Sequence, residues 1–398
     1  MSARVPVEWR IAKRRGICHL RPDMPAARPF LVYRDRIGAV SELGFLRRQY
    51  LGFSRLRPVW MGRTLLPAAD QVGEACLRLG GNGVIGALRR LAFRHLGAVP
   101  PLPLGLRADQ DRAPDWAPVM HAQFARGGAL ALPLARALGH SLFVTLHGGD
   151  VSKHKNWRPG SLLAQRWPDL VGYAAGFVCV SAAVADLAAA HGVPVAKLIV
   201  LPIGVAVPDN PPPRQAKAYL FVGRFVEKKG ITVLAEAMRR LRRQGNDTPL
   251  VCVGDGPLRP LLETLLREIA GVTLTGWLPP DQVQDQMRQA AALLVPSIIA
   301  AGGDAEGLPS VIPEAMAQGV PVIGSDQGGI AEALAQPDSG LLTSPGDAAA
   351  LALAMDRVVR DAGLAARLSA GGFQTAQRDL NCMVQSAKLE SLLLSAIG

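Results

Sequence analysis

The stretch AEGLPSVIPEAMAQGVPVIGSDQGGIAEAL, residues 305–334, decides the fold of this chain of 398 residues. Gly307 and Pro309 make a continuous helix unfavourable here, because glycine and proline both weaken helices. The pattern therefore predicts a loop that ends at Glu306, followed by a short helix that starts near Ser310.

The second half of this stretch predicts a strand between two helices. Gly319 is placed to end the first helix, because glycine favours the left-handed conformation after a helix. A buried strand is expected at Pro321–Gly324, and Gly328-Gly329 opens the next helix. Helix, strand and helix in succession indicate an α/β fold with a parallel sheet.

Two acids and a helix start in this stretch suggest a binding site for a phosphorylated ligand. The residues Gly307, Leu308, Pro309 and Ser310 lie at a helix N-terminus, where backbone N–H groups favour an anion. Glu306 would hold a ligand hydroxyl and Glu314 a vicinal diol such as ribose. The alternative is a solvated loop glutamate and a first-turn glutamate that interacts with the helix dipole.

The segments EGLPSVIPEAMAQGVPVI and GGIAE resemble the donor-site signature of retaining glycosyltransferases of family 4. This resemblance implies the α/β GT-B fold, with two Rossmann-like, doubly wound parallel-sheet domains that face each other across a cleft. It also implies hexosyl transfer, with retention, from a nucleotide-diphosphate sugar. The acceptor would be a saccharide, expected to be lipid-linked, in cell-surface or exopolysaccharide synthesis.

A histidine follows the predicted strand Leu142–Leu146, in the sequence His147-Gly-Gly-Asp150. The carboxyl ends of parallel strands line the ligand crevice of open α/β folds. The segment resembles the His-Gly-x-Asp segment of the same family, which implies that His147 reaches the donor hexose and acts with Glu306 in catalysis. Asp150 is expected to support the loop. The alternative for His147 is an ordinary loop histidine.

A basic loop, Gly223–Gly230, follows another predicted strand. It resembles the family's Gly-Arg and Lys-Gly segment, which implies that Arg224 and Lys229 bind the donor diphosphate; the alternative is a solvated basic turn. Because two cations already face the phosphates, no metal and no further cofactor is expected. The spacing of Asp304 and Glu306 is only a weak metal signal.

The chain divides at a proline-rich linker. We expect an acceptor-side domain over residues 1–207, a linker over 208–216 and a donor domain over 217–372. A C-terminal helix within 373–398 is expected to cross back to the first domain, as the resemblance implies.

The first hundred residues give weaker signals. A first strand is expected at Gly16–Leu20, followed by a loop without glycine over residues 21–30. Residues 81–86 match the dinucleotide fingerprint G-x-G-x-x-G, but the residues before them look helical and no acid stands 20 residues later. We therefore interpret this match as a turn between helices and reject a dehydrogenase.

Cysteine usage and hydropathy favour a cytoplasmic protein. The five cysteines include no CxxC pair, which favours buried thiols over a disulfide framework or a zinc site. The charged N-terminal residues argue against a secretory signal, and no apolar run is long enough to predict a membrane span.

Charge is distributed unevenly along the chain. Residues 1–200 hold 27 Lys and Arg against 12 Asp and Glu, whereas residues 201–398 hold 17 against 20. We expect the basic half to face an anionic membrane surface, which would make the protein peripheral on the inner face of the cytoplasmic membrane; the alternative is a solvated basic face. Two other functions stay open: a non-catalytic sugar-nucleotide-binding protein, and a basic nucleic-acid-binding protein, for which no recognition pattern is present.

Overall fold

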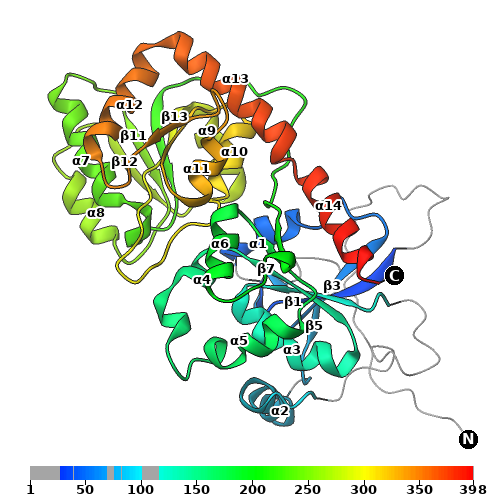
Figure 1. Ribbon diagram of the computed structural model, residues 1–398. Helices are drawn as coiled ribbons and strands as arrows, with labels where there is room; N and C mark the ends of the chain where they lie inside the picture. Colours follow the sequence, from blue (N-terminus) through cyan, green and yellow to red (C-terminus); the bar gives the residue numbers. More distant parts are fainter. Residues whose placement is uncertain (1–26, 39, 70–75, 82, 101–115, 398) are drawn as a thin grey trace, which may run out of the picture.

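Two α/β domains make up the part of the chain that the computed structural model describes, residues 27–38, 40–69, 76–81, 83–100 and 116–397 (Figure 1). Every strand pair in these residues is parallel. The predicted class, two doubly wound parallel sheets, is therefore confirmed.

The N-terminal domain is built on a seven-stranded sheet. In sheet order its strands are β5 (Cys76–Arg78), β3 (Leu56–Gly62), β1 (Arg28–Tyr33), β6 (Val119–Gln123), β7 (Ser141–Leu146), β8 (Gly176–Cys179) and β9 (Leu198–Val200). Two short strands of the same domain, β2 (Arg36–Ile37) and β4 (Thr64–Leu65), form a separate two-stranded sheet. The strand order reverses between β1 and β6, and such switch points form the ligand crevice in open α/β sheets.

The C-terminal domain repeats this plan with six strands. Their order is β12 (Val272–Gly276), β11 (Leu250–Val253), β10 (Ala218–Val222), β13 (Ala290–Val295), β14 (Val322–Ser325) and β15 (Leu341–Thr343). The switch point here lies between β10 and β13. All six residues of β13 are buried, as expected for a strand covered on both faces.

Helices connect the strands and cover the sheets. Those of the N-terminal domain are α1 (Val40–Arg48), α2 (Gly83–Leu96), α3 (Ala125–Leu138), α4 (Gly149–Ser152), α5 (Leu162–Tyr173) and α6 (Ala182–Ala190). The C-terminal domain contains α7 (Ile231–Arg243), α8 (Arg259–Leu266), α9 (Pro280–Gln289), α10 (Val311–Ala317), α11 (Gly328–Leu334) and α12 (Ala348–Arg360). Two more helices follow, α13 (Ala362–Asp379) and α14 (Cys382–Ser395).

The helix α14 packs on the N-terminal domain, although α13 before it belongs to the C-terminal domain (Figure 1). Leu389 and Leu393 are buried in the same core cluster as β1 and β3. Glu390 is buried, and its carboxylate accepts hydrogen bonds from the backbone N–H groups of residues 54–56 at 2.7–2.9 Å. These bonds fix the end of α14 to the start of β3.

The expected first strand, Gly16–Leu20, lies outside the described residues. The expected loop over residues 21–30 is wrong at its end, because β1 already begins at Arg28. The apolar run FLVY pairs with β3 on one side and β6 on the other, and Pro29 is tolerated near the start of the strand. The loop that follows β1 contains a glycine, Gly38, with a φ of +96°.

The residues before the G-x-G-x-x-G match are not helical as expected. Cys76–Arg78 form β5, so the match runs from a strand into α2. Three residues paired at a sheet edge leave little periodicity for a sequence pattern to show. Because β5 is the edge strand, its loop lies away from the switch point between β1 and β6.

Candidate active site

The carboxyl ends of the central strands of both sheets meet at the contact between the domains. Gly148 approaches Gly307 so closely that a Cβ atom on Gly148 would lie 2.4 Å from the amide nitrogen of Gly307. A Cβ atom on Gly307 would in turn lie 2.3 Å from the carbonyl oxygen of His147. The two backbones therefore touch at a place where only glycines fit.

A second contact between the domains involves a helix start. Glu332 of α11 accepts hydrogen bonds from the N–H groups of Ala182 and Ala183, both at 2.7 Å. These donors begin α6 in the other domain, so the carboxylate caps that helix across the domain boundary. The structure is therefore that of a closed pair of domains.

A cavity of about 190 Å³ lies beside this contact. It is lined by Phe45, His147, Val180, Ile203, Lys229, Glu306, Leu308, Pro309 and Ser310. Six of the residues predicted for the site thus lie around one cavity. Gly307 is buried beside it, whereas Arg224, Glu314 and Asp150 do not line it.

The imidazole of His147 is held between two aromatic rings. Its ring centroid lies 4.2 Å from that of Phe124 and 5.3 Å from that of Phe45. Phe124 has a φ of 68°, which is strained for a residue with a side chain, and the guanidinium of Arg34 lies over its ring. Burial, with a contribution from the charge of Arg34, lowers the pKa of His147 to about 3. His147 is therefore neutral at physiological pH.

Gln123 decides which nitrogen of His147 carries the proton. We assign its amide orientation from its neighbours: Nε2 donates to Gln49 Oε1 and to Tyr50 Oη, both at 2.7 Å. Gln123 Oε1 then faces His147 Nε2 at 3.0 Å and accepts a hydrogen bond from its N–H group. Nδ1 of His147 is left as a hydrogen-bond acceptor.

The network behind Gln123 is continuous and buried. Tyr50 Oη donates to His121 Nδ1 at 2.8 Å, and His121 Nε2 lies 2.6 Å from Thr145 Oγ1. Burial lowers the pKa of His121 to about 3, so this histidine is also neutral. Each member thus has a partner, which fixes Gln123 and through it the imidazole of His147.

A carboxylate at position 123 is expected to change the pH dependence of the reaction. In the wild-type protein, ionisation of His147 should leave no acid limb between pH 5 and 8, because its pKa is far below that range. In Gln123→Glu, a nearby negative charge favours the imidazolium and raises the pKa of His147. Transfer should then fall on the acid side within this range. An unchanged profile of kcat against pH would contradict the role of Gln123.

Asp150 holds the loop that carries His147. Its carboxylate accepts hydrogen bonds from the N–H groups of His147 at 2.9 Å and Ala125 at 2.8 Å. Burial raises the pKa of this carboxyl, although the backbone donors oppose the shift. The side chain points to the backbone and not to the cavity.

Two consecutive lysines form ion pairs with Glu306 within the C-terminal domain. Lys229 Nζ lies 2.9 Å from Glu306 Oε1, and Lys228 Nζ lies 3.6 Å from Oε2. Lys228 also contacts Asp304, which pairs with Lys153 of the other domain. Lys228 therefore supports the loop, whereas Lys229 faces the cavity.

Glu306 is ionised but retains an unused acceptor. Burial raises the pKa of this carboxyl, but the charges of Lys229 and Lys228 outweigh burial and hold the pKa below its usual range. Oε1 lies 2.9 Å from the ammonium of Lys229, and a carboxylate oxygen has two lone pairs, so one remains for another donor. A ligand hydroxyl in the cavity could donate to it.

Arg224 is exposed in the loop after β10, and its side chain makes no hydrogen bond or ion pair with the described residues. The side chain of Lys229 lies beside Gly223, the residue before Arg224. The two predicted cations thus come from one loop, with Arg224 outside the cavity and Lys229 at its wall.

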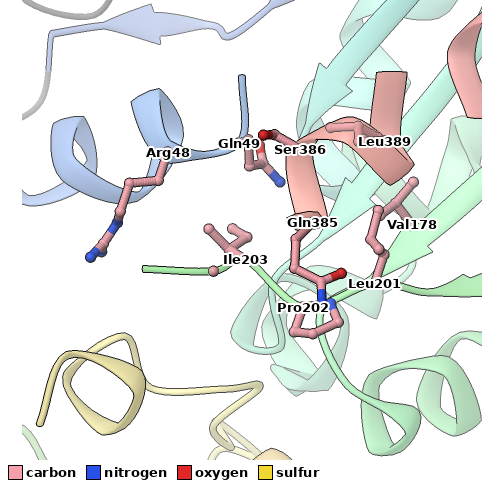
Figure 2. Close-up of a pocket in the computed structure, with 10 residues that line it drawn as sticks. Arg48, Gln49, Val178, Leu201, Pro202, Ile203, Gln385, Ser386 and Leu389 are labelled. Carbon is pink, nitrogen blue, oxygen red and sulfur yellow. The ribbon is translucent and has the colours of Figure 1, made fainter. Parts of the chain in front are cut away.

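Glu314 has a partner that the sequence did not predict. Arg48, the last residue of α1, reaches across to it, with Nη2 2.7 Å from Oε1. Figure 2 shows Arg48 extending away from α1 towards the C-terminal domain, while Gln49 turns back towards α14. A ribose could use Glu314 only by displacing this guanidinium.

Five residues that shape the site were not predicted: Arg34, Phe45, Arg48, Gln123 and Phe124. Gln123 and Phe124 had one usable signal, since Gln123 ends the buried strand β6 and Phe124 follows it directly, at the crevice edge. Of the other three, Arg34 follows β1, which was expected at its start to be a loop. Phe45 and Arg48 belong to α1, and no local pattern shows that this helix contacts the C-terminal domain.

The described residues contain no group of three His, Cys, Asp or Glu side chains placed to hold a metal ion. None of the four cysteines in the described ranges forms a disulfide.

Two family models match the chain, one in each domain. "Glycosyl transferase 4-like domain" matches residues 47–204, and "Glycosyl transferases group 1" matches residues 216–361. Together they span most of the chain.

Curated relatives match over part of their length. The amylovoran biosynthesis glycosyltransferase AmsK of Erwinia amylovora is 39% identical over 142 residues, 35% of each chain. The phosphatidyl-myo-inositol mannosyltransferase of Mycobacterium leprae is 35% identical over 42% of this chain and 43% of its own. The chain thus matches less than half the length of these two relatives.

A solved structure shares the whole fold. The Anabaena protein HepE, crystallised with UDP and glucose, superposes with a TM-score of 0.70 and 15% identity, covering 92% of this chain and 100% of its own. At this identity the likeness concerns the fold alone, and it shows the GT-B arrangement. With matching family models in both domains, the chain belongs to the family 4-like, group 1 glycosyltransferases.

Proposed function

We propose that the protein transfers a hexosyl group, with retention, from a nucleotide-diphosphate sugar to a saccharide acceptor in cell-surface or exopolysaccharide synthesis. The observation that carries this proposal is the cavity at the domain contact. It combines an uncharged histidine from one domain with a lysine and a buried carboxylate from the other. The curated relative AmsK, named for amylovoran biosynthesis, supports the polysaccharide acceptor.

The donor would lie along the switch point of the C-terminal sheet. Arg224 and Lys229 would bind its diphosphate, together with the backbone of residues 307–310. Glu306 Oε1 and His147 Nδ1 would accept hydrogen bonds from hexose hydroxyls, because Oε1 has a lone pair beyond its contact with Lys229 and Nδ1 has no partner among the described residues. Glu314 would bind the ribose once Arg48 has moved away.

The chemistry needs a good leaving group more than a strong base. The bond between the anomeric carbon and the diphosphate oxygen breaks, and the acceptor oxygen forms its bond on the same face of the sugar. The acceptor proton goes to the departing diphosphate. Positive charge at Arg224 and Lys229 stabilises the negative charge that develops there, so electrostatic stabilisation carries the rate.

The test combines binding and turnover. A panel of nucleotide-diphosphate sugars is screened by thermal shift, and the donor that stabilises the protein most is then incubated with saccharide acceptors. Proton NMR of the product should show the anomeric configuration of the donor. Inversion would contradict retention, and binding without turnover on any acceptor would favour a sugar-nucleotide-binding protein.

Removal of metal is expected to leave the transfer rate unchanged. Arg224 and Lys229 would supply the positive charge for which many transferases use a divalent ion. The measurement is turnover in excess chelator, with and without added divalent cations. Complete loss of activity that metal restores would contradict the proposal.

We also propose that the acceptor is lipid-linked and that the protein rests on the inner face of the cytoplasmic membrane. None of the helices in the described ranges is long and apolar enough to span a bilayer, so attachment would be peripheral. The mannosyltransferase of M. leprae, named for a phosphatidyl-inositol, supports a lipid acceptor.

Binding to vesicles is expected to need anionic lipid and to fall as salt rises. The 27 basic and 12 acidic residues of positions 1–200 make this half attractive to a negative surface, and ions screen that attraction. Co-sedimentation at several salt concentrations measures the effect. Equal binding to neutral and anionic vesicles would contradict it.

A further inference from the structure

The helix α2 exposes a row of large apolar side chains. The exposed fractions are 77% for Val84, 66% for Ile85, 61% for Leu88, 55% for Leu91 and 82% for Leu96. Only Gly86 and Phe93 of this helix are buried. So many exposed apolar residues on one helix indicate a contact surface.

The apolar side chains lie on one side of α2. At 100° per residue, they fall within an arc of about 140° on the helix surface. Gly86 and Phe93 fall on the opposite side, and Phe93 packs against Tyr33 in the domain core. The helix thus has one apolar side that anchors it to the domain and another that faces outward.

Two arginines flank the outward apolar side, and one histidine, His95, falls within it. By the same rotation, Arg89 lies at one edge of the arc and Arg94 lies beyond the other edge. No Asp or Glu occurs anywhere in residues 75–107. The long arginine side chains can therefore extend sideways to negative groups while the apolar residues between them are buried.

We propose that α2 is the element that binds the protein to an anionic membrane surface, with Val84, Ile85, Leu88, Leu91 and Leu96 inserted between lipid headgroups. This proposal rests on the membrane-surface acceptor proposed above and locates its contact. Helices with an apolar side, basic flanks and no acid lie in the interface of anionic bilayers.

The position of α2 fits this role. The helix lies at the end of the N-terminal domain that is far from the C-terminal domain (Figure 1). A membrane at α2 leaves the donor domain free to open and close. The cleft then lies away from the bilayer, so a lipid-linked acceptor must carry enough saccharide to reach it.

Charge disfavours a second copy of the chain as the occupant. A symmetric dimer through α2 would bring Arg89 and Arg94 of both copies to the same interface, with no acid of α2 to balance them. An anionic lipid surface satisfies the apolar side and the arginines together.

The first test removes apolar groups without adding charge. The variant Leu88→Gln/Leu91→Gln keeps good helix formers at exposed positions, so α2 should still form. Its partition onto vesicles of phosphatidylglycerol and phosphatidylcholine is expected to weaken about ten-fold or more. The matched control is Leu353→Gln, because Leu353 is 60% exposed on α12 of the other domain and should bind as the wild type does.

The second test removes charge. Arg89→Gln should weaken vesicle binding about five-fold, since each basic residue near an anionic surface contributes about 1 kcal/mol. Arg243→Gln, which removes an exposed arginine at the end of α7, should have little effect. Analytical ultracentrifugation of each variant shows whether the oligomeric state has changed.

The outcomes separate this inference from the proposed function. Loss of vesicle binding in the α2 variants, with unchanged melting temperature and unchanged transfer to a detergent-dispersed acceptor, supports it. If the α2 variants lose vesicle binding but the wild type transfers no sugar, the inference about α2 is still supported, and only the proposed transferase function is rejected. Three outcomes would overturn the inference. The α2 variants could bind vesicles as the wild type does, the wild type could bind no vesicles, or the wild type could form a dimer that the variants do not form.

Discussion

Lys229→Met is expected to lower the turnover for sugar transfer by about a hundred-fold or more, because the leaving diphosphate loses a preorganised positive charge. Affinity for both the nucleotide sugar and the free nucleoside diphosphate should fall by about 1.5–3 kcal/mol, the usual cost of a charge-assisted contact. Glu306→Gln should instead spare the nucleoside diphosphate and impair transfer, since its proposed partner is the hexose.

The pair of Lys229 and Glu306 also predicts an effect on stability. The pKa of Glu306 lies below its usual range, so folding favours the ionised form and the pair stabilises the protein at neutral pH. This contribution is lost as the pH falls through the folded pKa. Lys229→Met should therefore lower the free energy of unfolding by roughly 1–3 kcal/mol at pH 7 and by less in acid.

Comparison variants separate binding from stability. Lys229→Met/Glu306→Gln removes both charges, so it should recover most of the lost stability but none of the activity. Arg224→Ala should weaken diphosphate binding without destabilising the fold, because Arg224 is exposed and has no partner in the described ranges. Titration calorimetry and denaturant unfolding measure the two quantities. If both Lys229→Met and Arg224→Ala leave donor affinity and turnover unchanged, the proposed diphosphate site is wrong.

Gly307→Ala is expected to reduce transfer about a hundred-fold while leaving nucleoside diphosphate affinity within a few-fold. The new Cβ atom would lie 2.3 Å from the carbonyl oxygen of His147 and 2.9 Å from Val180 Cγ2, so the domains could not close to the same distance. A misplacement of about 1 Å at a reacting centre costs about two orders of magnitude in rate. Gly307 is not in the left-handed region, so alanine does not strain the donor domain itself.

Gly302→Ala is the matched control for this substitution. It lies in the same loop, has no positive φ, and a Cβ atom there would meet nothing within 4 Å. Turnover of Gly302→Ala should equal that of the wild type, and both variants should bind the nucleoside diphosphate. If Gly307→Ala turns over as fast as Gly302→Ala, the closed contact between the domains is not needed for the reaction.

The C-terminal domain could be predicted from its sequence because its signals are local. Ser310 does begin a short helix, Gly319 has a φ of +64° just after that helix, and β14 covers most of the expected strand. Strands buried on both faces carry continuous apolar runs, which separate clearly from amphipathic helices. These elements place Glu306 and the residues after it at the carboxyl edge of the sheet, whereas the roles of His147, Lys229 and Glu306 were expected from the resemblance to family 4 glycosyltransferases.

The N-terminal domain was harder because its signals depend on distant pairing. The runs ICHL and FLVY are both short and apolar, and only the partners β3 and β6 make FLVY a strand of the sheet. In the same way, the ion pair of Arg48 with Glu314 joins two helices in different domains, and neither residue's own neighbourhood reveals it. Phe124 likewise contacts the ring of His147, a residue more than 20 positions away, and no local pattern encodes this contact.

The packing of α14 has a consequence for how the chain is made. Leu389 and Leu393 complete the apolar core around β1 and β3, and Glu390 satisfies the backbone at the start of β3. A ribosome releases β1 and β3 long before it has synthesised α14. One apolar face of the first domain therefore stays exposed until the whole second domain has been synthesised. A nascent chain would need protection by chaperones at this face.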